Sequence, residues 1–231
     1  MGFERAVERP TRADLEVLIA RGRQDAADPA FCARLAEVAA DVLVRQADPT
    51  GSVSKADAVW LVAKLSNGGG LSCPAQFQML KRVFADALSV PPLLTAFAIR
   101  EIELAILTGR REILGGVDFE PAVVTAGDVE ALRALAFAPT REPSLPIDTG
   151  TVEALFDIAH ATGSARNDPA FADLFALLIA NHLKVCDNAG WILAHLSRGG
   201  PLTPAEARLL TLLKVEAASG RAELRLSLIH I

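Results

Sequence analysis

Apolar residues spaced three and four positions apart recur along almost the whole chain, and this spacing constrains the fold more than any other feature. Such stripes place their side chains on one face of an α-helix. No stretch alternates apolar and polar residues with the period of a strand, and alanine, which favours helix, fills many positions between the stripes. The sequence therefore predicts an all-α protein of roughly ten short helices, given ordinary helix lengths. Clear stripes are Phe31, Leu35, Val38, Val42; Phe77, Leu80, Val83, Phe84; and Phe171, Leu174, Phe175, Leu178.

One phrase occurs twice: residues 60–72 read WLVAKLSNGGGLS and residues 191–203 read WILAHLSRGGPLT. The similarity extends in both directions, because the sequence DPAF at 28–31 returns at 168–171. Self-similarity over such a span predicts the duplication of one helical unit. We expect two degenerate copies of a multi-helix unit in one helical domain, with a first repeat unit at 14–94, a connecting helical segment at 95–150 and a second repeat unit at 151–225.

The last six residues, Leu226 to Ile231, read LSLIHI. This is the translation of a transposon end used in sequencing libraries. We therefore expect these residues to be adapter read-through rather than part of the protein, and His230 to carry no chemistry. The alternative is an ordinary apolar end of a C-terminal helix.

A second short pattern predicts where helices begin. An apolar residue followed by Ser, Thr or Asp is typical of a helix N-cap, whose side-chain oxygen accepts a free backbone N–H of the first turn. Three of these caps are followed three residues later by an acidic residue (Asp57, Asp128 or Glu206), which suits the positive end of a helix. The five predicted starts are Val53-Ser54, Leu71-Ser72, Val124-Thr125, Ile147-Asp148 and Leu202-Thr203.

The first of these starts also matches the second half of an EF-hand calcium loop. Aligned in that register, residues 46–57 place Gly51 at loop position 6, Asp48 at position 3 and Asp57 at position 12. Position 1, however, is Gln46 rather than Asp. The loop is therefore a degenerate candidate for a divalent cation.

The glycine-rich loops lack the features of a phosphate site. Residues 66–70 follow a predicted helix rather than a strand, and they lack the Lys-Ser/Thr that ends a P-loop. We interpret Asn67, Gly68 and Gly199 as residues that accept the left-handed conformation at a helix end. Trp60 and Trp191, which precede these loops at equivalent places, are expected to fill the same position in the core; the alternative is an exposed anchor for a partner.

Few residues suggest catalysis or metal binding. Asp157 and His160 share a helix face and His182 lies on the next predicted helix, so the three could bind a metal. The alternative is that each histidine is solvated or bonded to a backbone carbonyl. Arg100, Glu101 and Glu103 interrupt the most apolar helix and are expected on a solvated face, with a buried Arg–Glu pair as the alternative. No catalytic, cofactor-binding or metal residue is assigned.

The composition limits which kinds of partner, and which cellular compartment, are expected for this chain. The formal net charge is −5 without a basic block, so nucleic acid is not expected as a partner. The first residues are charged and no apolar run approaches the ~20 residues that span a bilayer, so neither a secretory signal nor a membrane is expected. The chain has three cysteines and no CxxC, which fits a reducing cytoplasm.

Three segments carry a resemblance. They are ADPTGSVSKADAVWLVAKL, LSVPPLLTAFAIREIELAILTG and EALFDIAHATGSARNDPAFADLFALLIANHL. Together they resemble a family of uncharacterised, duplicated all-helical proteins from alphaproteobacteria, over about residues 14–225. The repeated helix starts are also similar to TerB-like helical domains of tellurite resistance. The resemblance implies an all-helical architecture and no particular activity.

The sequence thus favours a non-enzymatic helical interaction or structural module that binds an unknown protein partner, with stress response as a suggested setting and no cofactor. The alternative is a calcium-type, divalent-metal-binding regulatory protein that uses the Asp48–Asp57 loop. A third hypothesis is a metal-dependent enzyme that uses Asp157, His160 and His182.

Overall fold

The computed structural model describes residues 9–22, 24–25, 28–66, 70–137, 147–186, 189–196, 198 and 200–218. Over these residues the chain forms ten α-helices and no strand, which confirms the all-α prediction. The helices are α1 (Arg12–Arg21), α2 (Pro29–Ala40), α3 (Lys55–Ser66), α4 (Pro74–Asp86), α5 (Pro92–Thr108), α6 (Ala126–Phe137), α7 (Thr149–Ala161), α8 (Ala170–Val185), α9 (Ala189–Leu196) and α10 (Pro204–Ala218). A π-helical segment, Asp41–Arg45, continues α2, and a 3-10 turn, Glu112–Leu114, follows α5. The expected adapter residues, Leu226 to Ile231, lie outside the described residues.

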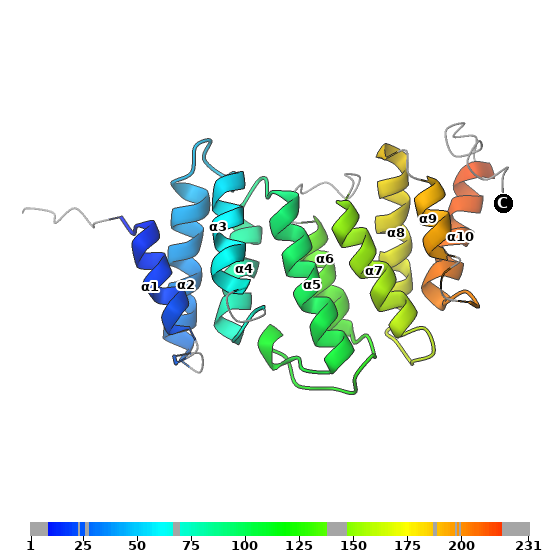
Figure 1. Ribbon diagram of the computed structural model, residues 1–231, viewed down its shortest axis with the longest axis horizontal. Helices are drawn as coiled ribbons and strands as arrows, with labels where there is room; N and C mark the ends of the chain where they lie inside the picture. The colour runs from blue at the N-terminus through cyan, green and yellow to red at the C-terminus, as the bar shows by residue number, and fades with distance from the viewer. Residues whose placement is uncertain are drawn as a thin grey trace, which may run out of the picture.

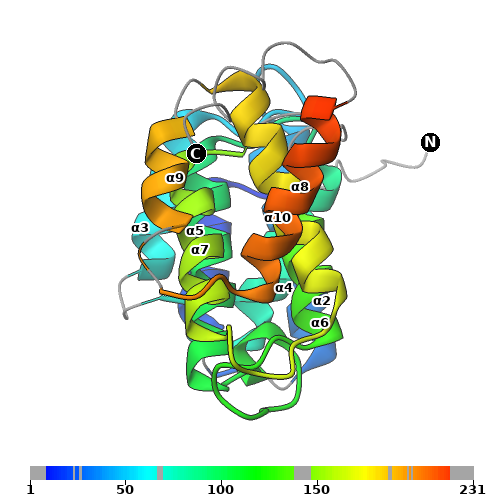
Figure 2. The same ribbon diagram turned by 90° about the vertical axis from the view of Figure 1, so that its right-hand side faces the viewer.

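The helices stand side by side in a row and form two layers (Figures 1 and 2). Helices α1, α3, α5 and α7 contact one another in order along one layer, and α2, α4, α6, α8 and α10 along the other. Helix α9 extends the first layer, because His195 of α9 packs against Phe156 of α7, with 5.2 Å between ring centroids. Each helix of the first layer is followed in the chain by its partner in the second. This alternation of short helices between two layers is the arrangement of an α-solenoid.

One continuous apolar core runs between the layers from Leu15 of α1 to Leu213 of α10. The most extensive contacts join α2 to α4 and α8 to α10, within the second layer. Trp60 and Trp191 are half-buried and pack against this core, as expected from their equivalent places in the repeated phrase. None of the helices in the described part of the chain is long and apolar enough to cross a bilayer.

The predicted helix starts are confirmed at four of five places. Thr125 and Thr203 form full capping boxes with Asp128 and Glu206. The Ser54 hydroxyl accepts the Asp57 N–H and donates to the Asp57 carboxylate. Asp148 accepts the Thr151 N–H at the start of α7.

The prediction for Ser72 is wrong by one residue. Pro74 occupies the first position of α4, so the cap falls on Cys73. Ser72 instead donates its N–H and its hydroxyl to Gln76 Oε1. At the second occurrence of the repeated phrase, Thr203 is followed directly by Pro204, and the threonine is the cap.

The boundaries expected for the repeat units fall inside helices, because 94/95 lies within α5 and 150/151 within α7. Each expected copy nevertheless contains four helices, α1–α4 or α7–α10, with α5 and α6 between them. The duplication itself stays a prediction.

Candidate functional site

The EF-hand-like loop connects the end of the π-helical segment to α3. Gly51 adopts φ +89°, and its N–H donates to the Val44 carbonyl at 2.8 Å. Ser52 forms a parallel bridge with Ser89, in the connection between α4 and α5. The loop is therefore held by backbone hydrogen bonds to its own helix and to a neighbouring connection.

The acidic residues of this loop do not converge. Asp57 accepts the Ser54 hydroxyl at 2.7 Å and pairs with Arg12 at 3.3 Å, whereas Asp48 is exposed. Gln46, at position 1, donates to the Pro10 carbonyl and to Asp41. Among the described residues no group of three or more His, Cys, Asp or Glu side chains is placed to hold a metal ion.

The first glycine-rich loop ends against a buried carboxyl. Asn67, Gly68 and Gly69 lie outside the described residues, but Gly70 adopts φ +125°, and a Cβ there would lie 2.6 Å from Glu101 Oε1 of α5. The Leu71 N–H donates to Glu101 Oε2 at 2.9 Å. Burial raises the pKa of the Glu101 carboxyl, and this hydrogen bond lowers it in part. The expectation that Glu101 lies on a solvated face is therefore wrong, because the carboxyl fills the space that glycine leaves.

In the second glycine-rich loop, the described Gly200 has no equivalent contact. Ser197 and Gly199 lie outside the described residues. Gly200 adopts φ +80°, yet nothing lies within 4 Å of the Cβ that could be added to it. The positive φ alone therefore explains why a glycine suits position 200. At position 70, a side chain would meet both an unfavourable φ and a clash with Glu101.

The residues proposed for a metal-dependent enzyme each have a different partner. Asp157 of α7 pairs with Arg100 of α5 at 3.0 Å, on the surface. His182 of α8 is buried, and its Nδ1 lies 2.6 Å from the Ile147 carbonyl oxygen. His160 of α7 lies 2.9 Å from Glu206 of α10. The structure thus does not bring the three side chains together into one donor set.

The His160–Glu206 contact belongs to a cluster that sequence reasoning missed. Glu206 is buried and accepts the N–H of the cap residue Thr203, so its second partner, His160, ties α7 to the start of α10. Nearby, the rings of Trp191 and His195 lie 3.8 Å apart, and His195 Nε2 lies 3.0 Å from Arg198. The acidic residue three positions after the cap was visible in the sequence, but its histidine partner lies on a distant helix.

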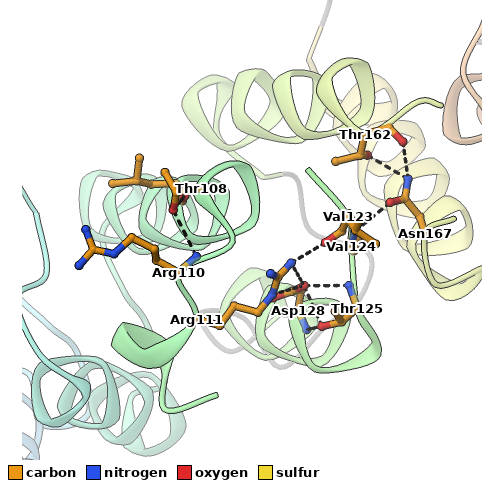
Figure 3. A network of polar contacts seen from close by, with 10 residues as sticks. Thr108, Arg110, Arg111, Val123, Val124, Thr125, Asp128, Thr162 and Asn167 are labelled. Atoms are coloured by element: carbon orange, nitrogen blue, oxygen red, sulfur yellow. Dashed lines mark hydrogen bonds and ion pairs between the residues drawn. The ribbon is translucent and has the colours of Figure 1, made fainter. Parts of the chain in front are cut away.

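A second missed cluster joins the connection after α5 to the start of α6 (Figure 3). Arg111 is buried and donates through Nε and Nη2 to the Asp128 carboxylate, at 2.9 to 3.0 Å. Its Nη2 also donates to the Val123 carbonyl. Asp128 in turn accepts the N–H and the hydroxyl of Thr125, each at 2.8 Å. The cap at Thr125 and the acidic residue three positions later were predicted, but nothing local in the sequence points to Arg111 as the partner of Asp128.

Comparison with protein-family models, with curated proteins and with solved structures finds no match to this chain. The resemblance to an alphaproteobacterial family and to TerB-like domains therefore stays a prediction.

Proposed function

We propose that this protein is a non-enzymatic interaction module that binds a protein partner through the outer face of the layer formed by α1, α3, α5, α7 and α9. The observation that carries the proposal is the extended two-layer row of helices (Figure 1). Such arrays present long surfaces on which successive helices each add a few contacts, and they commonly serve as binding scaffolds.

The exposed apolar side chains of this layer support the choice of face. Val17 of α1, Val59 of α3 and Leu104 of α5 are each about half exposed or more. Single exposed apolar residues are ordinary on a protein surface. Exposed apolar side chains on three successive helices of one layer would together offer a partner helix or strand an apolar contact surface.

Site-specific photo-crosslinking tests the proposal. A photoreactive residue at Val59 should crosslink a partner in the native host, and the same residue at Val215 of α10, which is similarly exposed on the other layer, should not. Val59→Glu should weaken binding of the purified partner roughly tenfold or more without lowering the melting temperature. Equal crosslinking at both positions, or unchanged binding by Val59→Glu, would overturn the assignment of this face.

The second candidate function is binding of a divalent cation by the Asp48–Asp57 loop. The backbone of Gly51 favours it, because a glycine at loop position 6 provides the sharp turn of an EF-hand loop. The pairing of Asp57 with Arg12 opposes it. Melting curves in millimolar calcium and in chelator separate the candidates: the interaction module predicts equal melting temperatures, and a rise of several degrees in calcium would favour the cation.

A further inference from the structure

A groove of about 640 Å³ lies at one end of the row of helices, between α1 and α2 (Figure 1). Leu18 and Val38 form part of its apolar surface, together with Val17, which is 59% exposed. The residues that precede α1, Arg9 to Thr11, also line it. An exposed apolar surface that is flanked by charged and polar side chains is typical of a place where another protein segment binds.

Three arginines give this groove an excess of positive charge. Arg21 pairs with Asp25 at 2.7 Å. Arg9 and Arg34 are exposed, and neither has an ion-pair partner in the part of the chain that the structure describes. Asp14 is the one carboxylate among the described lining residues, so the two unpaired guanidinium groups outnumber it. The groove therefore favours a segment that carries acidic side chains beside apolar ones.

The connection between α5 and α6 exposes a segment with this chemistry. Val117 is 87% exposed and Phe119 is 54% exposed. Each is followed in the sequence by an exposed acidic residue, Asp118 or Glu120, and neither carboxylate has an ion-pair partner among the described residues. Neighbouring exposed apolar side chains are typical of a binding segment, and the two carboxylates complement the arginines of the groove.

This segment is held in one conformation by its own molecule. The Phe119 N–H donates to the Gly109 carbonyl at 3.0 Å, and the Asp118 carboxylate accepts the Glu112 N–H at 3.0 Å. Gly109 adopts φ +74°, and a Cβ there would lie 2.3 Å from the Phe119 carbonyl oxygen. Because these contacts fix the backbone before any binding, docking of the segment loses little conformational entropy.

From these observations we propose that residues 117–120 of one copy of this chain dock in the groove between α1 and α2 of a second copy. The two apolar side chains of the segment pack on the apolar part of the groove, and its two carboxylates approach Arg9 and Arg34. The groove and the connection lie apart along the row (Figure 1), so the contact needs two molecules. It joins two different surfaces and closes into a dimer where each copy supplies both. Apart from Val17, it uses none of the side chains assigned above to the partner surface.

Sedimentation equilibrium from about 1 µM to 1 mM tests the self-association, a range that covers small and weak interfaces. The average mass should rise above that of the monomer with concentration. Val117→Lys, which places a cation beside the arginines, and Arg34→Glu should each weaken the association at least about tenfold. Val215→Lys on α10 and Arg166→Glu between α7 and α8 are matched controls at exposed positions and should associate like the unchanged protein. A chain that stays monomeric over the whole range would overturn the proposal.

A mixture of the two variants tests whether these two surfaces bind each other. The Arg34→Glu variant keeps an unchanged 117–120 segment, and the Val117→Lys variant keeps an unchanged groove. An equimolar mixture should therefore associate through this intact contact at concentrations where each variant alone is monomeric. If the mixture also stays monomeric, the segment does not bind the groove and the proposal is wrong.

Val59→Glu separates this proposal from the proposed function. Val59 lies on α3 and does not line the groove, so the variant should self-associate like the unchanged protein while losing the partner. If Val59→Glu abolishes self-association, the copies meet through the outer face of the first layer and the groove is not their contact. The two proposals therefore fail in different measurements.

Discussion

At the scale of single residues, the buried glutamates of α5 couple stability to pH. Burial raises the pKa of Glu101 above its ordinary value of 4.5, and the Leu71 N–H offsets this in part. Burial also raises the pKa of Glu103, against the effect of Arg100. Each carboxyl therefore binds its proton more tightly in the folded than in the unfolded protein. The stability that depends on this proton is fully present below the unfolded pKa and declines as the pH rises through the folded pKa.

Replacing Glu101 by glutamine should raise the free energy of unfolding at neutral pH and flatten its decline above about pH 4.5. Glutamine keeps an oxygen for the Leu71 N–H but carries no charge to bury. Urea unfolding from acid to neutral pH measures the effect, with Glu120→Gln, at an exposed position, as the control. The prediction fails if both variants retain the same dependence on pH.

Contacts between residues close in the sequence were predictable, and contacts such as Leu71–Glu101, between distant residues, were not. A cap such as Thr203 and its acidic partner Glu206 lie three residues apart, so spacing alone identifies them. Leu71 and Glu101 are 30 residues apart, and His160 and Glu206 are 46 residues apart. No periodicity encodes such contacts, because they depend on how the helices pack.

At the scale of elements, the Arg111–Asp128 pair connects two helices that are adjacent in the chain but belong to different layers. Arg111 follows α5, and Asp128 lies in the first turn of α6. The pair fixes the path of the long connection, since Arg111 also donates to the Val123 carbonyl just before α6. Helix starts and types could be read from the sequence; the ion pair that positions α6 could not.

Arg111→Met should destabilise the protein by about 3–5 kcal/mol, because it leaves the Asp128 carboxylate buried without its cation. Chemical denaturation measures this loss. Arg110→Met is the control at the adjacent, exposed arginine and should change stability by less than about 0.5 kcal/mol. Adding Asp128→Asn to Arg111→Met should recover part of the lost stability. If Arg111→Met and Arg110→Met change the free energy of unfolding equally, the role assigned to Arg111 is wrong.

At the scale of the whole molecule, the apolar stripes predicted the helices but not their two layers. A stripe says that one face of a helix is buried; it does not say which helix covers that face. The pairing of α2 with α4 and of α8 with α10 follows from the packing of side chains that are far apart in the sequence. Trp60 of α3 and Trp191 of α9, which the repeated phrase pairs, both pack against the same continuous core.

A two-layer row of helices should lose stability locally, since each helix contacts mainly its neighbours. Leu209 of α10 and Leu80 of α4 are both fully buried, and truncation of such a leucine to alanine costs about 2–5 kcal/mol. Leu209→Ala should reduce hydrogen-exchange protection in α8 and α10 while the amides of α2 and α4 stay protected, and Leu80→Ala should do the reverse. If either variant lowers hydrogen-exchange protection uniformly along the chain, the prediction is wrong. The helices then unfold as one unit, because the core couples the two ends of the row.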